Sequence, residues 1–447
     1  MKLKAIIIFF ISFSVYAQNT EASRLAVIQY GTETEITALI QTLRTEGADY
    51  LDNELLALME TTRNQKILSG IFAFFGEREK SGLEDRAIRV IDERDAEANE
   101  TVLLAVDYLG RVKAGDAVPV LMELLDSEER RFMNNAFRAL GRASSANTQL
   151  ADETADFLTD YYNHRNPGDE NSREVIVALG ETRSSNAVAL LVELASDTDE
   201  RIPLRIAALE ALAKVGDQAG LEAILACVRT NDPNVRSTAV AALGPFSGEE
   251  VDKAILDAFR DSYYRTRIAA AQASRERKFE AAVPYLRFRA ENDEIANVKD
   301  EAIRALGAIA NEEAVNILDS LFTERKNSDR VRLMAAEMLM KNAAGRNLSR
   351  VMAELDEAKR RNQTALTNGF LRIIGEAQVE GDTSEIENLT RRFLQNGDIM
   401  EKLYGLDMAV NNNLTNLSVE ITALFNDRNE SLARKARRTA ERLGIEI

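Results

Sequence analysis

The sequence contains almost none of the residues on which side-chain chemistry most often depends. Its 447 residues include one cysteine, one histidine and no tryptophan. A disulfide framework needs paired cysteines, and zinc sites draw on several cysteines or histidines, so both classes are excluded. A Ser-His-Asp or Cys-His arrangement would have to use His164 with a partner that no motif identifies. We therefore expect no catalytic residues, no metal and no cofactor, and a protein that is not an enzyme.

Proline and aromatic residues are also scarce. There are 6 prolines and 6% aromatic residues, against 45% hydrophobic and 29% charged residues. This balance excludes collagen-like and low-complexity chains, and it is typical of a soluble helical protein. The sequence has no glycine-rich phosphate-binding motif of the P-loop or dinucleotide type.

Positive charge is in deficit. The chain has 56 Lys and Arg against 73 Asp and Glu, a net charge of −17. A chain this acidic repels nucleic acid and anionic lipid unless its bases are clustered. We therefore expect a protein partner and no nucleic-acid partner.

One hydrophobic run stands out, at the N-terminus. Lys2 and Lys4 precede an apolar run from Ala5 to Ala17, with small residues before Gln18. This is the pattern of a secretory signal peptide over residues 1–17, and the run is shorter than the roughly 20 residues that span a bilayer. The sequence predicts export, to the periplasm in a bacterium or by secretion otherwise, and no stable membrane span after cleavage. Cleavage also removes two lysines and leaves −17 − 2 = −19.

The rest of the chain repeats a short apolar segment that ends in glycine. Three less regular copies end near Lys278, Met340 and Val410, and the mean interval over the twelve copies is about 33 residues, as in helical solenoids. We expect each glycine to end a helix. The regular copies end at Gly76, Gly110, Gly141, Gly180, Gly216, Gly244, Gly307, Gly375 and Gly444.

Each repeat is expected to hold two amphipathic helices. Apolar residues over 117–125 form one helical stripe, and Phe132, Ala136 and Leu140 form a second stripe before Gly141. Two such helices cannot bury both stripes alone, so neighbouring pairs must stack. At 231–236, Asp232 is expected to cap a helix with Pro233 in its first turn.

At this point the chain resembles the HEAT-repeat family, particularly its bacterial members. The resemblance rests on the A-V-P-x-L-x-x-L-L run at 117–125, the D-P-N-V-R turn at 232–236, and acids and bases six residues apart. It implies an all-α fold, a right-handed α-α superhelix (HEAT/ARM-like solenoid) of about eleven helix pairs over residues 35–447, after a lead-in over 18–34. The acid–base pairs, expected to form salt-bridge ladders between neighbouring turns, are Asp199/Arg205, Asp261/Arg267 and Asp293/Lys299.

Residues 260–289 depart from this pattern because bases and aromatic residues gather there. Arginine and tyrosine are favoured at protein interfaces, so we expect this cluster to bind a partner with an acidic surface. The alternative is that the bases neutralise acids on adjacent repeats. The candidate residues are Tyr263, Tyr264, Arg265, Arg267, Arg275, Arg277, Lys278, Arg287 and Arg289.

Two further segments are candidates of lower rank. The interval before Gly180 is long, and a loop over 161–169 is expected there, either as a binding loop or as a plain connection. Bases also crowd the expected last helix, 431–444, where a capping role competes with a binding patch. The loop candidates are Tyr161, Tyr162, His164 and Arg165.

The HEAT family consists mostly of scaffolds and binding surfaces. The resemblance therefore implies an exported, non-enzymatic scaffold or adaptor that binds a protein with the concave face of the solenoid. Two alternatives stay open: a structural component of a cell-envelope assembly, and an enzyme like the few HEAT-like proteins that are bilin lyases. The sequence leaves the oligomeric state and the partner open.

Overall fold

A computed structural model describes residues 21–165 and 168–445, so the predicted signal peptide, 1–17, lies outside the described residues. Every regular element in these ranges is a helix. The chain divides at Thr230 into two compact units, unit 1 before this residue and unit 2 after it. The expected all-α class is thereby confirmed.

Unit 1 consists of short helices joined by tight turns. Its elements are α2 (Glu21–Tyr30), α3 (Glu33–Glu46), α4 (Asp52–Thr61), α5 (Gln65–Glu77), α6 (Glu84–Asp92), α7 (Asn99–Arg111), η1 (Gly115–Ala117), α8 (Val118–Asp126), α9 (Arg130–Ser144), α10 (Thr148–Arg165), α11 (Gly168–Thr182), η2 (Ser185–Ala187), α12 (Val188–Ser196), α13 (Ile202–Val215), η3 (Gln218–Gly220) and α14 (Leu221–Cys227).

Unit 2 follows the same plan. Its elements are α15 (Pro233–Ala242), α16 (Glu249–Ala258), α17 (Tyr264–Glu276), η4 (Glu280–Ala282), α18 (Val283–Asn292), α19 (Ala296–Ile309), α20 (Glu312–Thr323), α21 (Asp329–Arg360), α22 (Thr364–Gly375), α23 (Ser384–Asn396), α24 (Ile399–Asn411), η5 (Thr415–Leu417), α25 (Ser418–Thr422) and α26 (Glu430–Leu443).

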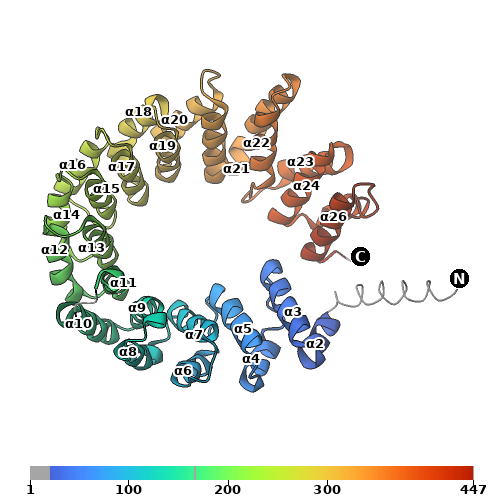
Figure 1. Ribbon diagram of the computed structural model, residues 1–447. Coiled ribbons are helices and arrows are strands. Elements are labelled where there is room, and N and C mark those ends of the chain that lie inside the picture. Colours follow the sequence, from blue (N-terminus) through green and yellow to red (C-terminus); the bar gives the residue numbers. More distant parts are fainter. Residues whose placement is uncertain (1–20, 166–167, 446–447) are drawn as a thin grey trace. The chain divides into compact units, whose positions relative to one another are not determined.

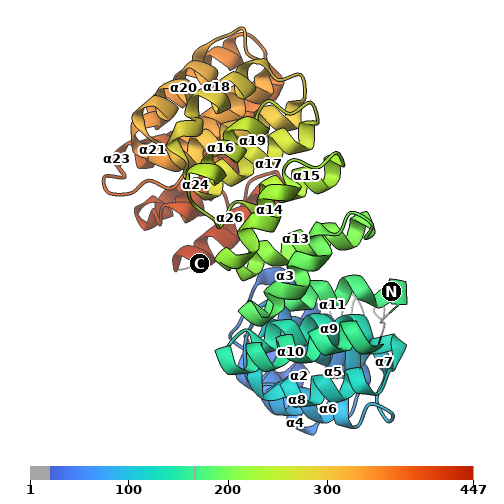
Figure 2. The ribbon, with the colours of Figure 1, turned by 90° about the vertical axis from the view of Figure 1, so that its left-hand side faces the viewer.

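Within each unit the helices form two layers (Figure 1). The second helix of every pair packs against the second helix of the next pair, from α3 to α13 in unit 1 and from α15 to α26 in unit 2. These helices line the concave side of their unit and are called the inner layer; the first helices form the outer layer. Figure 2 shows α18 beside α20 in the outer layer and α17 beside α19 in the inner one.

The long helix α21 contributes to both layers because it contains a kink. Ala343 leaves the helical region with φ −160° and ψ 72°. The side-chain amide of Asn347 donates to the carbonyl oxygens of Leu339 at 2.9 Å and Ala343 at 3.0 Å. Because these hydrogen bonds satisfy carbonyls at the break, the chain passes from an inner to an outer helix without a loop.

The predicted repeat is confirmed in position. All twelve apolar segments fall on inner-layer helices or on the residues just after them. Each unit has six complete pairs among its described residues, and α2 with α3 form a pair ahead of the first segment. The array therefore starts inside the stretch expected as a lead-in, 18–34. The expected cap at Asp232 is confirmed, since its carboxylate accepts from the backbone N–H of Asn234 at 2.9 Å and Val235 at 3.0 Å.

The expected role of most repeat glycines is wrong. Gly110, Gly141 and Gly180 lie inside α7, α9 and α11, which continue past them. A Cβ on Gly110 would lie 2.7 Å from the Cα of Ala139, and a Cβ on Gly180 would lie 2.7 Å from the Cα of Ala211. These glycines allow adjacent inner helices to approach closely.

Only two of the expected helix stops have the conformation of a left-handed C-cap. Gly216 has φ 69° and Gly444 has φ 66°. Elsewhere the left-handed position after an inner helix is occupied by other residues, among them Lys113 with φ 53°, Arg183 with φ 59° and Lys278 with φ 48°.

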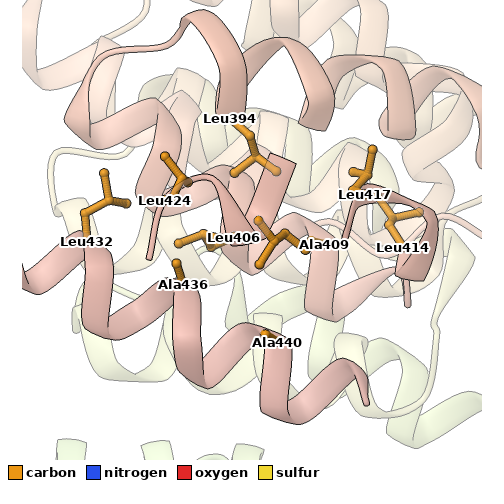
Figure 3. Packing of buried hydrophobic residues seen from close by; sticks show 10 residues of the cluster. Leu394, Leu406, Ala409, Leu414, Leu417, Leu424, Leu432, Ala436 and Ala440 are labelled. Atoms are coloured by element: carbon orange, nitrogen blue, oxygen red, sulfur yellow. The ribbon is translucent and has the colours of Figure 1, made fainter. Parts of the chain in front are cut away.

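The core of each unit lies between its two layers. At the C-terminal end of unit 2, leucines and alanines from α23 to α26 interdigitate, with Leu406, Leu417 and Leu432 fully buried (Figure 3). The lone thiol, on Cys227, is buried as predicted and lies 3.3 Å from the carbonyl oxygen of Ala195. Burial raises the pKa of this thiol and keeps it protonated.

The close approach of the inner helices can be tested by adding one methyl group. We expect Gly110→Ala to lower the free energy of unfolding by about 1–3 kcal/mol, because the new Cβ would overlap the backbone of α9. Gly70→Ala, in α5, is the matched control: its Cβ would make ordinary contacts with the Ile40 side chain, at 3.5 Å from Cδ1 and 3.7 Å from Cγ2. In urea denaturation the control should be unchanged or up to about 1 kcal/mol more stable, since alanine favours a helix. Equal effects of the two changes would contradict the packing role.

Candidate partner-binding surface

The most buried base of the 260–289 cluster is held between repeats. Arg267 and Asp293 form a bidentate ion pair, in which Nε donates to Oδ2 at 2.8 Å and Nη2 donates to Oδ1 at 2.8 Å. The Asp293 side chain is 1% exposed. Arg289 approaches the same carboxylate at 3.2 Å. This part of the cluster therefore joins α17 to the turn before α19 and is not free for a partner.

Asp261, Arg267 and Asp293 form the expected salt-bridge ladder between neighbouring turns, but Asp261 and Arg267 do not pair with each other. Arg267 donates to the backbone oxygen of Asp261 at 3.0 Å, while the Asp261 carboxylate pairs with Arg236 of the preceding repeat at 2.6 Å. The ladder thus runs from repeat to repeat, Arg236 to Asp261 and Arg267 to Asp293. This choice of partner has a simple cause. Arg267 donates through Nη1 to backbone oxygens of the turn that carries Asp261, so its Nε and Nη2 are directed to Asp293 in the next turn.

The other two expected pairs bond to backbone and not to each other. Arg205 donates through Nε to the carbonyl oxygen of Ala195 at 3.1 Å, and Lys299 donates to that of Glu291 at 2.9 Å. Both bases secure the end of the preceding outer helix, α12 or α18, whose last carbonyl groups lack helical partners.

Three more bases of the cluster have acidic partners. Arg275 lies 2.9 Å from Glu301, Arg277 lies 2.5 Å from Asp252, and Arg287 lies 3.0 Å from Glu291. The first ion pair links neighbouring repeats, and the second joins the outer and inner helices of one repeat. For these bases, as for Arg267 and Arg289, neutralisation of nearby acids accounts for the positive charge.

Arg265 and Lys278 remain exposed, and neither makes an ion pair within the described ranges. Arg265 lies over the ring of Tyr264 at 5.9 Å and donates to its hydroxyl at 3.3 Å; this hydrogen bond raises the pKa of the guanidinium. The Tyr263 hydroxyl donates a hydrogen bond to the side-chain oxygen of Asn234 at 3.0 Å. The predicted cluster is thus divided, and only part of it faces solvent.

Aromatic residues of the same region shape the outer layer. A hollow of about 330 Å³ is lined by Arg260, Pro284, Tyr285, Phe288 and Arg289. The guanidinium of Arg260 lies 5.3 Å from the ring centre of Tyr285. Four of the five lining residues belong to α18, a helix of the outer layer.

The loop expected over 161–169 is mostly helical. Helix α10 continues to Arg165, and the longer interval is taken up by its 18 residues. Tyr161 is buried and packs against Phe137 at 5.2 Å between ring centres. Tyr162 is half-buried, and burial raises the pKa of its hydroxyl. His164 is exposed and its Nδ1 lies 2.9 Å from a carboxylate oxygen of Asp160. Of the remaining loop residues, Asn166 and Pro167 and the side chain of Arg165 lie outside the described residues.

Sequence reasoning missed a set of bases on the inner layer of unit 2. They come from three consecutive inner helices, and their acidic partners lie on the same or the adjacent inner helix. Arg304 and Arg372 share a signal that the sequence offers: each stands three residues before a repeat glycine, as does Arg138 in unit 1. The missed bases are Arg304 with Glu301 at 3.0 Å, Lys341 with Glu337 at 2.8 Å, Arg372 with Glu337 at 3.0 Å, and Arg330 with Asp300.

Two searches over the part of the chain that the structure describes are negative. None of its helices is both long and apolar enough to cross a membrane. Nor does this part contain a group of three or more His, Cys, Asp or Glu side chains placed to hold a metal ion.

Comparison with known proteins identifies a family. Residues 28–439 match the model of the family described as Spirochaete HEAT repeat protein. No curated protein matches the sequence. The predicted HEAT resemblance is therefore confirmed.

Solved structures are similar at low identity. The crystal structure of Kap121p aligns with a TM-score of 0.43 and 12% identity, covering 97% of this chain and 55% of Kap121p. This chain thus spans about half the length of Kap121p, whose solved structures include one bound to RanGTP and one bound to Pho4p. The complex of CpcE and CpcF of phycocyanin lyase from Nostoc sp. PCC7120 aligns with a TM-score of 0.33 and 15% identity, over 66% of this chain and 94% of that chain.

The buried carboxylate of Asp293 links the ladder to pH. Burial alone would raise its pKa, but hydrogen bonds from Arg267 and from the backbone N–H of Ile295, with the charges of Arg267 and Arg289, hold the pKa below its usual value. A carboxyl group with a lowered folded-state pKa stabilises the fold above its unfolded pKa of about 3.9. That stabilisation is lost as the pH falls through the lower folded-state value.

We therefore expect Asp293→Asn to lower the free energy of unfolding by about 3 kcal/mol at pH 7, because Arg267 loses its buried counter-charge. The difference from the native chain should be constant from about pH 5 to 8 and should shrink below about pH 4. Denaturant titrations across this range measure it. Asp319→Asn is the control: Asp319 pairs with Arg350 at the surface, so its loss should change stability by about 0–1 kcal/mol. If Asp293→Asn lowers the free energy of unfolding no more than Asp319→Asn does, the ladder does not stabilise the fold.

Proposed function

The chain belongs to the Spirochaete HEAT repeat protein family, and on that premise we propose that it is an exported, non-enzymatic scaffold or adaptor that binds a protein partner along its inner helix layer. HEAT-type solenoids stack helix pairs into extended concave surfaces suited to binding. The observation that carries the proposal is that ion pairs hold exposed side chains in fixed positions on the inner layer of unit 2.

These ion pairs bridge consecutive inner helices. Arg275 of α17 meets Glu301 of α19, Arg330 of α21 meets Asp300 of α19, and Arg372 of α22 meets Glu337 of α21. Side chains that are already fixed lose less conformational entropy when a partner binds. Helices packed at about 8–10 Å from one another also give a partner several anchoring rows across one continuous face.

Export is supported by the N-terminal pattern of Lys2, Lys4 and the apolar run over 5–17. We expect the mature protein to begin at Gln18 and to be recovered from the periplasm. N-terminal sequencing of protein isolated from fractionated cells measures both properties. Recovery of the full chain with its N-terminal residues in the cytoplasm would contradict export.

Binding along the inner layer can be tested by blocking it. Asn368 of α22 is exposed and Gln272 of α17 is half-buried, and both lie on inner helices. We expect Gln272→Trp with Asn368→Trp to reduce the amount of partner recovered with the tagged chain after in-cell cross-linking by about tenfold or more, since bulky rings on this face separate the two surfaces.

The matched control places the same rings on the outer layer, as Asn316→Trp with Ser320→Trp on α20. Circular dichroism should show both variants folded, and the control should recover as much partner as the native chain. Equal recovery by all three chains would contradict binding through the inner layer.

A further inference from the structure

On the inner layer of unit 2, bases are exposed and the acids that pair with them are buried. Glu301 has a side chain that is 8% exposed, while those of its partners Arg275 and Arg304 are 41% and 46% exposed. Asp300 is 4% exposed and its partner Arg330 is 61% exposed. A molecule that approaches this face therefore meets the bases first, although the whole chain carries a net charge of −17.

The same arrangement recurs on the next inner helices. Glu337 of α21 is 23% exposed, whereas its partners Lys341 and Arg372 are 64% and 43% exposed. Arg372 also reaches Glu376, which is exposed at the end of α22. On α17, Arg265 is exposed and its guanidinium contacts the ring and hydroxyl of Tyr264.

Helical spacing places these bases on one face. On α17 the side chains that are not buried recur every three or four residues, at Arg265, which is exposed, and at Ile268, Gln272 and Arg275, which are half-buried. On α21 the exposed stripe includes Arg330 and Lys341, and on α19 and α22 it includes Arg304 and Arg372. The inner basic row, defined by these side chains, consists of Arg265, Arg275, Arg304, Arg330, Lys341 and Arg372.

We propose that the inner basic row binds an acidic segment of a protein partner, one that carries several Asp and Glu side chains. The proposal rests on the proposed function and names the surface and the chemistry that it recognises. A guanidinium has five N–H donors in a planar fork, and each buried carboxylate occupies only part of one fork. The arginine side chains that carry these donors, Arg275, Arg304, Arg330 and Arg372, are 41–61% exposed, so carboxylates can reach them for bidentate hydrogen bonds.

Carboxylates suit this row better than a phosphate polymer does. Every base of the row except Arg265 pairs with an acid, and the inner helices that carry the row pack at about 8–10 Å from one another. DNA carries one charge per about 1.7 Å of its axis and is bound through a dense positive field, which a net charge of −17 opposes. Separate, hydrogen-bonded contacts to spaced side-chain carboxylates need no such field.

The test removes three bases without leaving a buried acid unpaired. In the inner variant Arg265→Gln, Arg304→Gln and Lys341→Gln are combined, so that Glu301 keeps Arg275 and Glu337 keeps Arg372. The outer variant makes the same change in charge with Lys253→Gln, Arg287→Gln and Arg325→Gln, all exposed and outside the inner layer. Chemical denaturation should show the two variants to be equally stable.

The probe is a fluorescent 20-residue peptide in which Glu alternates with Gly and Ser, titrated by anisotropy at 150 mM salt. At this ionic strength charges more than about 8 Å away are largely screened, so the distant acids of the chain do not hide the row. We expect the native chain and the outer variant to bind the peptide equally and the inner variant to bind about tenfold more weakly, a difference of about 1.4 kcal/mol.

Three results would overturn the proposal: equal weakening in both variants, no binding of the acidic peptide by the native chain, or tighter binding of duplex DNA or of vesicles containing anionic lipid than of the peptide. Self-association that the inner variant abolishes, without peptide binding, would also overturn it by making a second copy the occupant. If the native chain does not bind the peptide, while the two tryptophan substitutions on the inner layer still block partner recovery, the proposed function stands. Only the proposal that the partner segment is acidic is then wrong.

Discussion

The structure depends on how closely one inner helix can approach the next. At Gly141 a Cβ would lie 2.5 Å from the backbone oxygen of Ala178 in the following inner helix, and Gly110 and Gly180 are as tightly placed against alanines. Backbone meets backbone at these points, so the inner layer packs tightly while larger side chains fill the core between the layers.

In the inner layer of unit 2 the repeat glycines meet side chains of the next inner helix, as Gly307 meets Met338 and Gly375 meets Tyr404, and the charged side chains have an order of their own. Where adjacent inner helices meet, Asp300 and Glu301 are buried and the longer Arg275, Arg304 and Arg330 extend past them to solvent. A buried carboxylate must be paired to be tolerated, and a long basic side chain can pair with it while its head reaches water. An acidic chain thereby presents bases on one face. The ladder through Asp261 and Asp293 joins repeats and is not offered to a partner, since the bases in it, Arg236 and Arg267, are largely buried.

The sequence alone predicted the helix pairs and their period because each pair carries two apolar stripes at helical spacing. It did not distinguish a glycine that ends a helix from one that allows close approach, because both follow the same apolar run, as Gly216 and Gly180 do. The sequence showed how many bases the cluster has, but not which of them pair with acids and which stay exposed. The partner of Arg267, for example, lies 26 residues away on another repeat. The helical end of α10 was missed because Asn-Pro-Gly-Asp indicates a turn but does not say how far the preceding helix runs.

The most direct test of the account is site-specific photo-cross-linking in cells, with a photoreactive amino acid at Ala308 on the inner layer or at Lys253 on the outer layer of unit 2. The account predicts that Ala308 cross-links to a discrete protein partner and that the cross-linked peptide of this partner is rich in Asp and Glu, while Lys253 gives no such product. A discrete partner that cross-links at Lys253 and not at Ala308 would contradict it.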